Sequence, residues 1–332
     1  MKAILSQVVG GPSTLVFAEA PDPAPRAGQV LVKVHACGVN YPDSLIIEDR
    51  YQFKAQRPFS PGGEIAGEIV ALGEGAAKLQ LGQRVLASIG WGGMAELAAV
   101  DARRVVAIPD VMPFDEAAAL LMTYGTTIHA LKDRAALKAG ESLLVLGAAG
   151  GVGSAAIELG KAMGAHIIAA VSSPEKAEAV KAWGADSTVV YPTGPFDRDG
   201  QKKLADLFKS ACGESGADVI YDGVGGDYTE AALRAIAWEG RLLVVGFPAG
   251  IPKLPLNLTL LKSCQVVGVF WGAFATKFPE KNAANTHELF VLYEKGLIKP
   301  HISKRFPLSE GGDAIAWITG RNAMGKVVVT ID

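Results

Sequence analysis

The sequence predicts an α/β protein in which a β-rich module is combined with a doubly wound parallel-sheet domain. Two patterns support this fold class. Short strands divided by glycine and proline fill the N-terminal part, as at 30–36 and 64–70, where apolar and polar residues alternate as they do in an antiparallel sheet. From 143 onward, nearly continuous apolar strands alternate with helices, which is typical of a parallel sheet covered on both faces.

Length and composition agree with a soluble protein of two domains. The 332 residues exceed the usual size of one core, and 49% are hydrophobic. A net charge of -2 provides no overall positive field for nucleic acid or anionic lipid. No apolar run reaches the roughly 18 residues of a membrane span, and Met1–Leu5 lacks the pattern of a signal peptide. We therefore expect neither nucleic acid nor a membrane among the partners.

The three cysteines lie far apart and form no CxxC pair. This spacing argues against a disulfide framework and against a structural zinc lobe. A reducing compartment fits best, and we expect a cytoplasmic protein.

Strands and helices are expected in a definite order along the chain. A helical pattern begins near 113, and the last strand, 326–331, is expected to rejoin the N-terminal module. The remaining segments expected are strand 143–146 and helix 152–163, strand 167–171 and helix 174–183, and strands 219–221 and 242–245. The predicted domains are 1–122 with 268–332, and 123–267.

A glycine-rich turn, Gly147–Gly153, follows an apolar strand and precedes an alanine-rich helix. In this context the pattern predicts a dinucleotide site, because small residues permit a tight turn and a close approach of the pyrophosphate. The pyrophosphate would lie on the helix N-terminus, where free N–H groups favour anions. The expected cofactor-binding residues of the turn are Ala148, Gly150, Gly151, Val152 and Gly153.

The end of the following strand indicates which dinucleotide is bound. A protein selective for NAD usually presents an acidic residue there to the ribose hydroxyls. Here the strand ends in Ser172 and Ser173, with Lys176 shortly after. Two hydroxyls and a lysine suit a 2′-phosphate, so we expect NADPH.

Further motifs resemble the quinone oxidoreductase (ζ-crystallin-like) branch of the medium-chain dehydrogenase/reductase superfamily. The resemblance runs from the first strand to the last. It implies a GroES-like catalytic domain, discontinuous in sequence, and a Rossmann NADPH-binding domain. The motifs that carry it are 37–43 (CGVNYPD), 61–67 (PGGEIAG), 82–85 (GQRV), 93–96 (GMAE), 222–226 (DGVGG), 240–246 (GRLLVVG) and 325–328 (GKVV).

The resemblance also implies that this branch works without zinc. Asn40 and Gly63 stand where zinc alcohol dehydrogenases of the superfamily carry a metal-binding cysteine and histidine, and the four-cysteine lobe expected after Gly93 is missing. A tetrahedral zinc site needs three or four convergent Cys, His or carboxylate ligands. We therefore predict no metal.

The resemblance assigns roles to several other residues. Asn40 would face the nicotinamide and the substrate, Thr127 would lie along the cofactor, and Tyr191 would lie near the adenine. Gly246 would lie beside the ribose, and Asn322 would reach the cofactor from the final segment. Strand 266–270 would pair with a second subunit to give a homodimer.

For the catalytic chemistry we expect NADPH to pass hydride to a quinone-like acceptor, a reaction that needs no dedicated acid. The alternative is reduction of an activated C=C bond, in an enone or a 2-enoyl thioester, where a tyrosine would protonate the product. Tyr51 is the candidate donor, with Tyr41 and Tyr124 competing. A third possibility is a cofactor-binding protein with a structural or regulatory role, as in lens ζ-crystallins.

Overall fold

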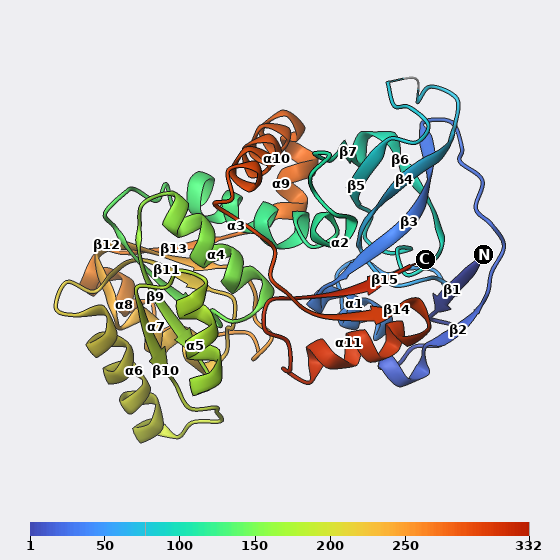
Figure 1. Cartoon of the computed structure of the whole chain (residues 1–332). Coiled ribbons are helices and arrows are strands. Elements are labelled where there is room, and N and C mark those ends of the chain that lie inside the picture. The colour runs from blue at the N-terminus through green and yellow to red at the C-terminus, as the bar shows by residue number, and fades with distance from the viewer. Residues whose placement is uncertain (77, 332) are drawn as a thin grey trace. The chain divides into compact units, whose positions relative to one another are not determined.

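The computed structural model describes residues 1–76 and 78–331. By its internal contacts the chain forms two compact units (Figure 1). Unit 1 comprises Met1–Met122 together with the chain from Pro300 onward, and unit 2 comprises Thr123–Lys299. The expected combination of a β-rich module with a doubly wound domain is confirmed.

Unit 1 is built on a sheet in the order β14-β15-β3-β4-β5-β7, with β6 also paired to β3. Its strands are β3 (Gln29–Val39), β4 (Glu64–Leu72), β5 (Arg84–Ser88), β6 (Leu97–Asp101), β7 (Val105–Ala107), β14 (Ile302–Pro307) and β15 (Lys326–Thr330). The last strand rejoins the N-terminal module as predicted, because β15 runs antiparallel to β3 with Val328 opposite Gly38. Helices α1 (Tyr41–Ile47), α2 (Phe114–Ala117) and α11 (Gly311–Thr319) and the hairpin β1 (Lys2–Leu5) with β2 (Val16–Glu19) complete the unit.

Alternation on β3 explains why this strand lies in the core. Val30, Val32 and Val34 are buried on one face, while Lys33 is exposed on the other. The same buried face meets apolar side chains of β4, β5, α11 and β15 in one hydrophobic cluster. An apolar face of this kind contributes about 25 cal/mol per Å² of surface removed from water.

Unit 2 contains six parallel strands in the order β10-β9-β8-β11-β12-β13. They are β8 (Ser142–Leu146), β9 (His166–Val171), β10 (Ser187–Val190), β11 (Ala217–Asp222), β12 (Ile236–Val244) and β13 (Gln265–Gly268). The helices are α3 (Thr126–Ile128), α4 (Gly151–Ala162), α5 (Pro174–Ala182), α6 (Arg198–Cys212), α7 (Asp227–Leu233), α8 (Asn257–Lys262), α9 (Trp271–Lys277) and α10 (Pro279–Glu294). No helix among the described residues is long and apolar enough to cross a bilayer.

Local signals account for the helix boundaries of unit 2. Ser173 caps α5 and is followed by Pro174, while Asp197 caps α6 by accepting the N–H of Gly200 at 2.7 Å. The helical pattern expected from near 113 includes π-helical segments at Leu121–Gly125 and His129–Arg134, on either side of α3.

The second unit extends further along the chain than the domain expected at 123–267. Residues up to Lys299 pack with it. The reason is tertiary pairing: β13 adds to β12 with Val266 beside Leu242, and Asn285 of α10 donates to the carboxylate of Asp133 at 2.9 Å. Mixed composition near 270 suggested a return to the first module, but those contacts keep 268–299 in the second.

Candidate functional site

The glycine turn lies at the carboxyl end of β8. Gly147 has a φ of 63°, in the left-handed region, and its carbonyl accepts the N–H of Gly150 at 2.9 Å. A Cβ on Gly153 would lie 2.4 Å from the Gly147 carbonyl oxygen, so a side chain there would clash with backbone. The turn therefore brings the N-terminus of α4 close to the end of β8, which forms an anion-binding geometry.

The sheet order places this turn at a reversal point. From β8 the chain adds β9 and β10 on one side, then returns to place β11 directly beside β8 on the other. In open α/β sheets, ligands bind in the crevice outside the carboxyl ends of the strands at such a point. The turn predicted from sequence is therefore at the position where the fold offers a binding crevice.

The residues expected to recognise a 2′-phosphate lie together at the end of β9. The Lys176 ammonium donates to the Ser172 hydroxyl at 3.5 Å, and the Ser173 hydroxyl accepts the Lys176 N–H at 3.3 Å. Glu175 belongs to the same turn, and its pKa is lowered by its own backbone N–H and by a hydrogen bond from Ser173. The strand end thus offers one ammonium and two hydroxyls, with one exposed carboxylate beside them.

Thr127 and Gly246 also lie near the carboxyl ends of the central strands. The Thr127 hydroxyl is 2.8 Å from the Tyr221 hydroxyl and donates to the Val152 carbonyl at 3.4 Å, so Thr127 is beside the start of α4. Gly246 follows β12, and its N–H donates to the Asp222 carbonyl at 3.3 Å.

Tyr191, directly after β10, is placed differently from an open adenine platform. Its side chain is only 6% exposed, and its ring packs against those of Phe208 and Tyr228. Only a small part of this ring is available to a ligand.

In unit 1, Asn40 belongs to a buried polar cluster that sequence reasoning did not predict. Its amide nitrogen donates to the Gly38 carbonyl at 3.2 Å and to Glu64 Oε2 at 3.1 Å, while its oxygen accepts from Lys326 Nζ at 2.6 Å. Both amide hydrogens are therefore used within the unit. Asn40 has no donor left for a hydride acceptor.

Glu64 and Lys326 form the charged part of this cluster. Their side chains are 0% and 3% exposed and lie 3.3 Å apart. Glu64 also accepts the N–H of Met122 at 2.9 Å, and Lys326 donates to the Val39 carbonyl at 3.4 Å. The sequence could have revealed this ion pair, because a glutamate and a lysine each stand at the start of a buried apolar strand. A buried charge requires a partner.

Asp43 is a second buried carboxylate of the cluster. It accepts the Asn40 N–H at 2.7 Å. Burial raises the pKa of Asp43 to about 7, against the hydrogen bond from Asn40 and the charge of Lys326, which lower it. The charge of Asp43 therefore changes near neutral pH.

The three tyrosines considered as proton donors differ in accessibility. Tyr51 is half-buried against the core of unit 1, and burial, followed by the charge of Asp43, raises its pKa and keeps it protonated. Tyr41 is 37% exposed. Tyr124 is buried, and its hydroxyl donates to Glu158 at 2.6 Å.

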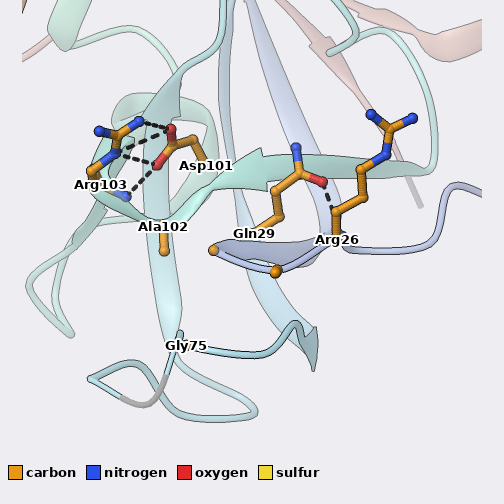
Figure 2. Close-up of a pocket in the computed structure, with 8 residues that line it drawn as sticks. Arg26, Gln29, Gly75, Asp101, Ala102 and Arg103 are labelled. Atoms are coloured by element: carbon orange, nitrogen blue, oxygen red, sulfur yellow. Dashed lines mark hydrogen bonds and ion pairs between the residues drawn. The ribbon is translucent and has the colours of Figure 1, made fainter.

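Surface pockets lie on the described part of unit 1. One, of about 470 Å³, is lined by Arg26, Gln29, Asp101 and Arg103 and holds no predicted site residue (Figure 2). Arg103 points toward Asp101 and is bonded to it at 2.6 Å (Figure 2). Another, of about 420 Å³, includes Asn322. The exposed Asn322 therefore lies in a pocket of unit 1.

Metal ligands do not gather at the positions considered from sequence. Cys37 is fully buried, and burial raises the pKa of its thiol well above the usual value. Within 1–76 and 78–331, no group of three or more His, Cys, Asp and Glu side chains is placed to hold a metal ion.

The fold and the glycine turn together define a two-domain nucleotide-dependent oxidoreductase. Residues 26–110 match the alcohol dehydrogenase GroES-like domain, and residues 151–286 match a family described as zinc-binding dehydrogenase. Quinone oxidoreductase-like protein 2 of Bos taurus is 37% identical over 96% of this chain and 89% of its own length. Human quinone oxidoreductase is 32% identical over 100% of this chain and 98% of its own length. The chain belongs to the quinone oxidoreductase-like branch of the medium-chain dehydrogenase/reductase superfamily.

Solved structures agree with this assignment. Escherichia coli quinone oxidoreductase complexed with NADPH has a TM-score of 0.89 at 26% identity and covers 99% of this chain and 100% of that one. A mycobacterial protein complexed with NADPH has a TM-score of 0.91 at 29% identity, covering 99% of each chain.

Replacement of the buried lysine should destabilise unit 1. In Lys326→Met the Glu64 carboxylate stays buried without its cationic partner, and we expect a loss of about 3–5 kcal/mol in the free energy of unfolding. Urea denaturation of the wild type and the variant measures this change in the free energy of unfolding. The control is Lys33→Met, at an exposed position on β3. Equal stability of the two variants would show that the ion pair is energetically neutral.

The raised pKa of Asp43 makes stability depend on pH. Because the folded pKa of about 7 exceeds the unfolded value of 3.8, the folded state binds this proton more tightly between those values. The stability contribution is therefore present at low pH and lost as pH rises toward 7, with a slope of at most about 1.4 kcal/mol per unit. Asp43→Asn should flatten the curve of unfolding free energy against pH, whereas the exposed Asp313→Asn should not. Superimposable curves for wild type and Asp43→Asn would contradict the assignment.

Proposed function

We propose that the protein is an NADPH-dependent oxidoreductase that transfers hydride to a quinone-like acceptor without zinc. One observation carries the proposal: the glycine turn lies at the reversal point of the sheet, with Ser172 and Lys176 together at the end of the neighbouring strand. Relatives solved with NADPH support the same cofactor.

The residues present fit this cofactor. Gly150, Gly151 and Gly153 leave room for the pyrophosphate at the N-terminus of α4, with Ala148 and Val152 completing the turn. Lys176 and Ser172 would hold the 2′-phosphate by charge-assisted hydrogen bonds. Bound NADPH supplies the hydride, while the chain orients donor and acceptor and excludes water.

Asn40 contributes by its position. We propose that it lies against the nicotinamide and the acceptor, as the resemblance implies, and that it acts through its shape. Its two N–H groups are already donated to Gly38 and Glu64. Thr127, Tyr191, Gly246 and Asn322 remain proposed cofactor contacts, and only a small part of the Tyr191 ring is exposed.

The donor set at the positions that the resemblance equates with metal ligands supports a mechanism without zinc. Asn40 and Gly63 stand at the two positions where the related zinc enzymes bind metal. An amide bonded to a lysine and a glycine without a side chain are not the thiolate, imidazole and carboxylate ligands that zinc prefers. We therefore propose that no metal takes part in hydride transfer.

Lys176 should decide between the two dinucleotides. We expect Lys176→Ala to weaken NADPH binding by roughly 10- to 100-fold, because a hydrogen bond to a charged group contributes about 1.5–3 kcal/mol. Affinity for NADH should not change. Titration calorimetry with both cofactors measures it, and Lys181→Ala on the same helix is the control. A parallel loss for NADH and NADPH would refute the assignment of Lys176 to the 2′-phosphate.

The acceptor is tested with the chelator-treated protein. NADPH oxidation is measured against a simple quinone, a short enone and a short enoyl thioester, with NADH as the cofactor control. Fast reduction of the quinone with NADPH supports the proposal. Selective turnover of the enone or thioester replaces it by C=C reduction, and the absence of turnover with tight NADPH binding favours a non-catalytic role.

The C=C alternative is supported by one feature, the half-buried Tyr51 with its raised pKa. If Tyr51 donates the proton, Tyr51→Phe should lower kcat for the enone by about 100-fold or more while quinone reduction continues. Tyr41→Phe provides the comparison. Unchanged enone turnover in Tyr51→Phe leaves this residue with a packing role alone.

We also propose a homodimer formed along β13. This edge strand carries the exposed Val266, and the exposed Leu260 and Leu261 lie on the preceding helix. An unpaired edge with apolar neighbours is suited to another copy of the same strand. Val266→Lys should convert a dimer to a monomer in light scattering, whereas Val190→Lys on β10, the opposite edge, should not. A monomeric wild type would refute the dimer.

The cytoplasmic location remains part of the proposal. The three cysteines lie far apart in the sequence and form no CxxC pair, a pattern that favours a reducing compartment. Cell fractionation with an antibody against the chain tests it, and recovery outside the cytoplasmic fraction would contradict it.

A further inference from the structure

We propose that Asp222 is a positioning residue for the nicotinamide half of the bound cofactor. The inference rests on the proposed NADPH-dependent function and adds a residue to that site. Asp222 is the last residue of β11 and is 1% exposed. It lies beside the end of β8, since Asp222 pairs in register with Leu146.

The carboxylate of Asp222 holds the loop that follows β11. Its Oδ1 atom accepts the N–H groups of Val224 and Gly225, both at 2.9 Å, and Oδ2 accepts the Thr229 hydroxyl at 2.5 Å. Burial raises the pKa of this carboxyl, and the hydrogen bonds from Thr229, Gly225 and Val224 oppose the rise. Three donors directed at one buried carboxylate fix the shape of the loop.

The backbone of Asp222 also joins the loop that follows β12. Its carbonyl accepts the N–H groups of Val245 at 3.0 Å and Gly246 at 3.3 Å. The two loops are bonded to each other as well, because the Ala249 N–H donates to the Val224 carbonyl at 2.9 Å. A single residue therefore anchors both loops at the carboxyl end of this half of the sheet.

The anchored loop directs Val224 toward the glycine turn. A Cβ built on Gly147 would lie 2.8 Å from Val224 Cγ2, so this side chain sits directly against the turn. Gly225 has a φ of 75°, and a Cβ there would lie 2.5 Å from the Cβ of Phe247. Among the described residues, the Asp222 carboxylate is the acceptor for the N–H groups of Val224 and Gly225, while the Val224 carbonyl is held by the N–H of Ala249.

The sheet order indicates which half of the cofactor this loop meets. Ser172 and Lys176, the residues proposed for the adenosine phosphate, lie at the end of β9, on one side of β8. A dinucleotide crosses the reversal point with its pyrophosphate on the turn after the first strand. The nicotinamide half therefore extends over β11 and β12, where Asp222 anchors the loops.

The same strand offers a matched control. Asp218 lies at the opposite end of β11, where its carboxylate accepts the backbone N–H of Ser142 at 2.8 Å and the hydroxyl of Ser142 at 2.9 Å. Removal of either carboxylate deprives backbone N–H donors of an acceptor. Only Asp222 lies at the ligand-binding end.

The experiment compares two ligands in wild type, Asp222→Ala, Asp222→Asn and Asp218→Ala. Calorimetry measures the Kd of NADPH and of adenosine 2′,5′-bisphosphate, which lacks the nicotinamide half, and kcat is measured with the best acceptor found. Circular dichroism and urea unfolding report folding. If Asp222→Ala does not fold, Asp222→Ser, which keeps one oxygen acceptor, is judged by the same criteria.

We expect Asp222→Ala to bind NADPH about tenfold more weakly and to turn over more slowly, since a misplacement of about 1 Å can cost about 100-fold in rate. Binding of the bisphosphate should stay within about twofold of wild type. Asp222→Asn keeps an oxygen for the two N–H donors and should retain most of the affinity. Asp218→Ala should lose stability without loss of either ligand.

Two results would overturn the inference. If Asp222→Ala weakens the binding of NADPH and of the bisphosphate equally, Asp222 has a general structural role. If the kcat of Asp222→Ala matches that of Asp218→Ala, Asp222 has no positioning role at the site. If the wild type binds neither ligand, the proposed function itself is refuted. If the wild type binds both ligands and Asp222→Ala changes neither Kd nor kcat, only the role of Asp222 is refuted.

Discussion

The parallel pairing of β8 with β11 is the constraint on which the cofactor half of the molecule depends. These two strands are far apart in sequence, yet their register places Leu146 beside Asp222 at the carboxyl ends of the strands. In open α/β sheets, the connections after two such neighbouring strands run to opposite faces of the sheet. Ligands bind between these connections, outside the carboxyl ends of the strands. The glycine turn, the loop after β11 and the loop after β12 all meet at this end of the sheet. The pairing of β8 with β11 brings the first two together, and the pairing of β11 with β12 adds the third.

The other unit depends on buried charge. Lys326 at the start of β15 meets Glu64 at the start of β4 and the amide of Asn40 between them. A buried ion pair is a weak source of net stability, because desolvation offsets much of the attraction. It nevertheless favours the observed register of β15, since a shift of this strand would move Lys326 away from Glu64. The last strand is therefore held in the sheet both by its buried apolar side chains and by the ion pair of Lys326 with Glu64.

This polar cluster also changes the interpretation of Asn40. The resemblance to related enzymes made it a catalytic candidate in place of a metal ligand, and the structure shows its amide hydrogens bonded to Gly38 and Glu64. Because both N–H groups of its amide are already donated, Asn40 is suited to contact a substrate by its shape and not by donating a hydrogen bond. For reduction of a quinone this is sufficient, because solvent can protonate the product. For reduction of a C=C bond another group must supply the proton, which directs attention to Tyr51.

The sequence by itself determined the fold class, the strand and helix order and the place of the dinucleotide turn. These features follow from local rules: side-chain alternation, apolar strand runs, and glycines where a backbone needs positive φ or close approach. It also indicated that Ser172 and Lys176 would act together, since both lie within one strand end. Tertiary structure alone decided that 268–299 joins the second unit and that Tyr191 is mostly enclosed. It also decided that Lys326 pairs with Glu64 and that Asp222 is buried at the end of β11. Those outcomes depend on pairings between residues far apart in the chain, and no local pattern states which distant partner a buried charge will meet.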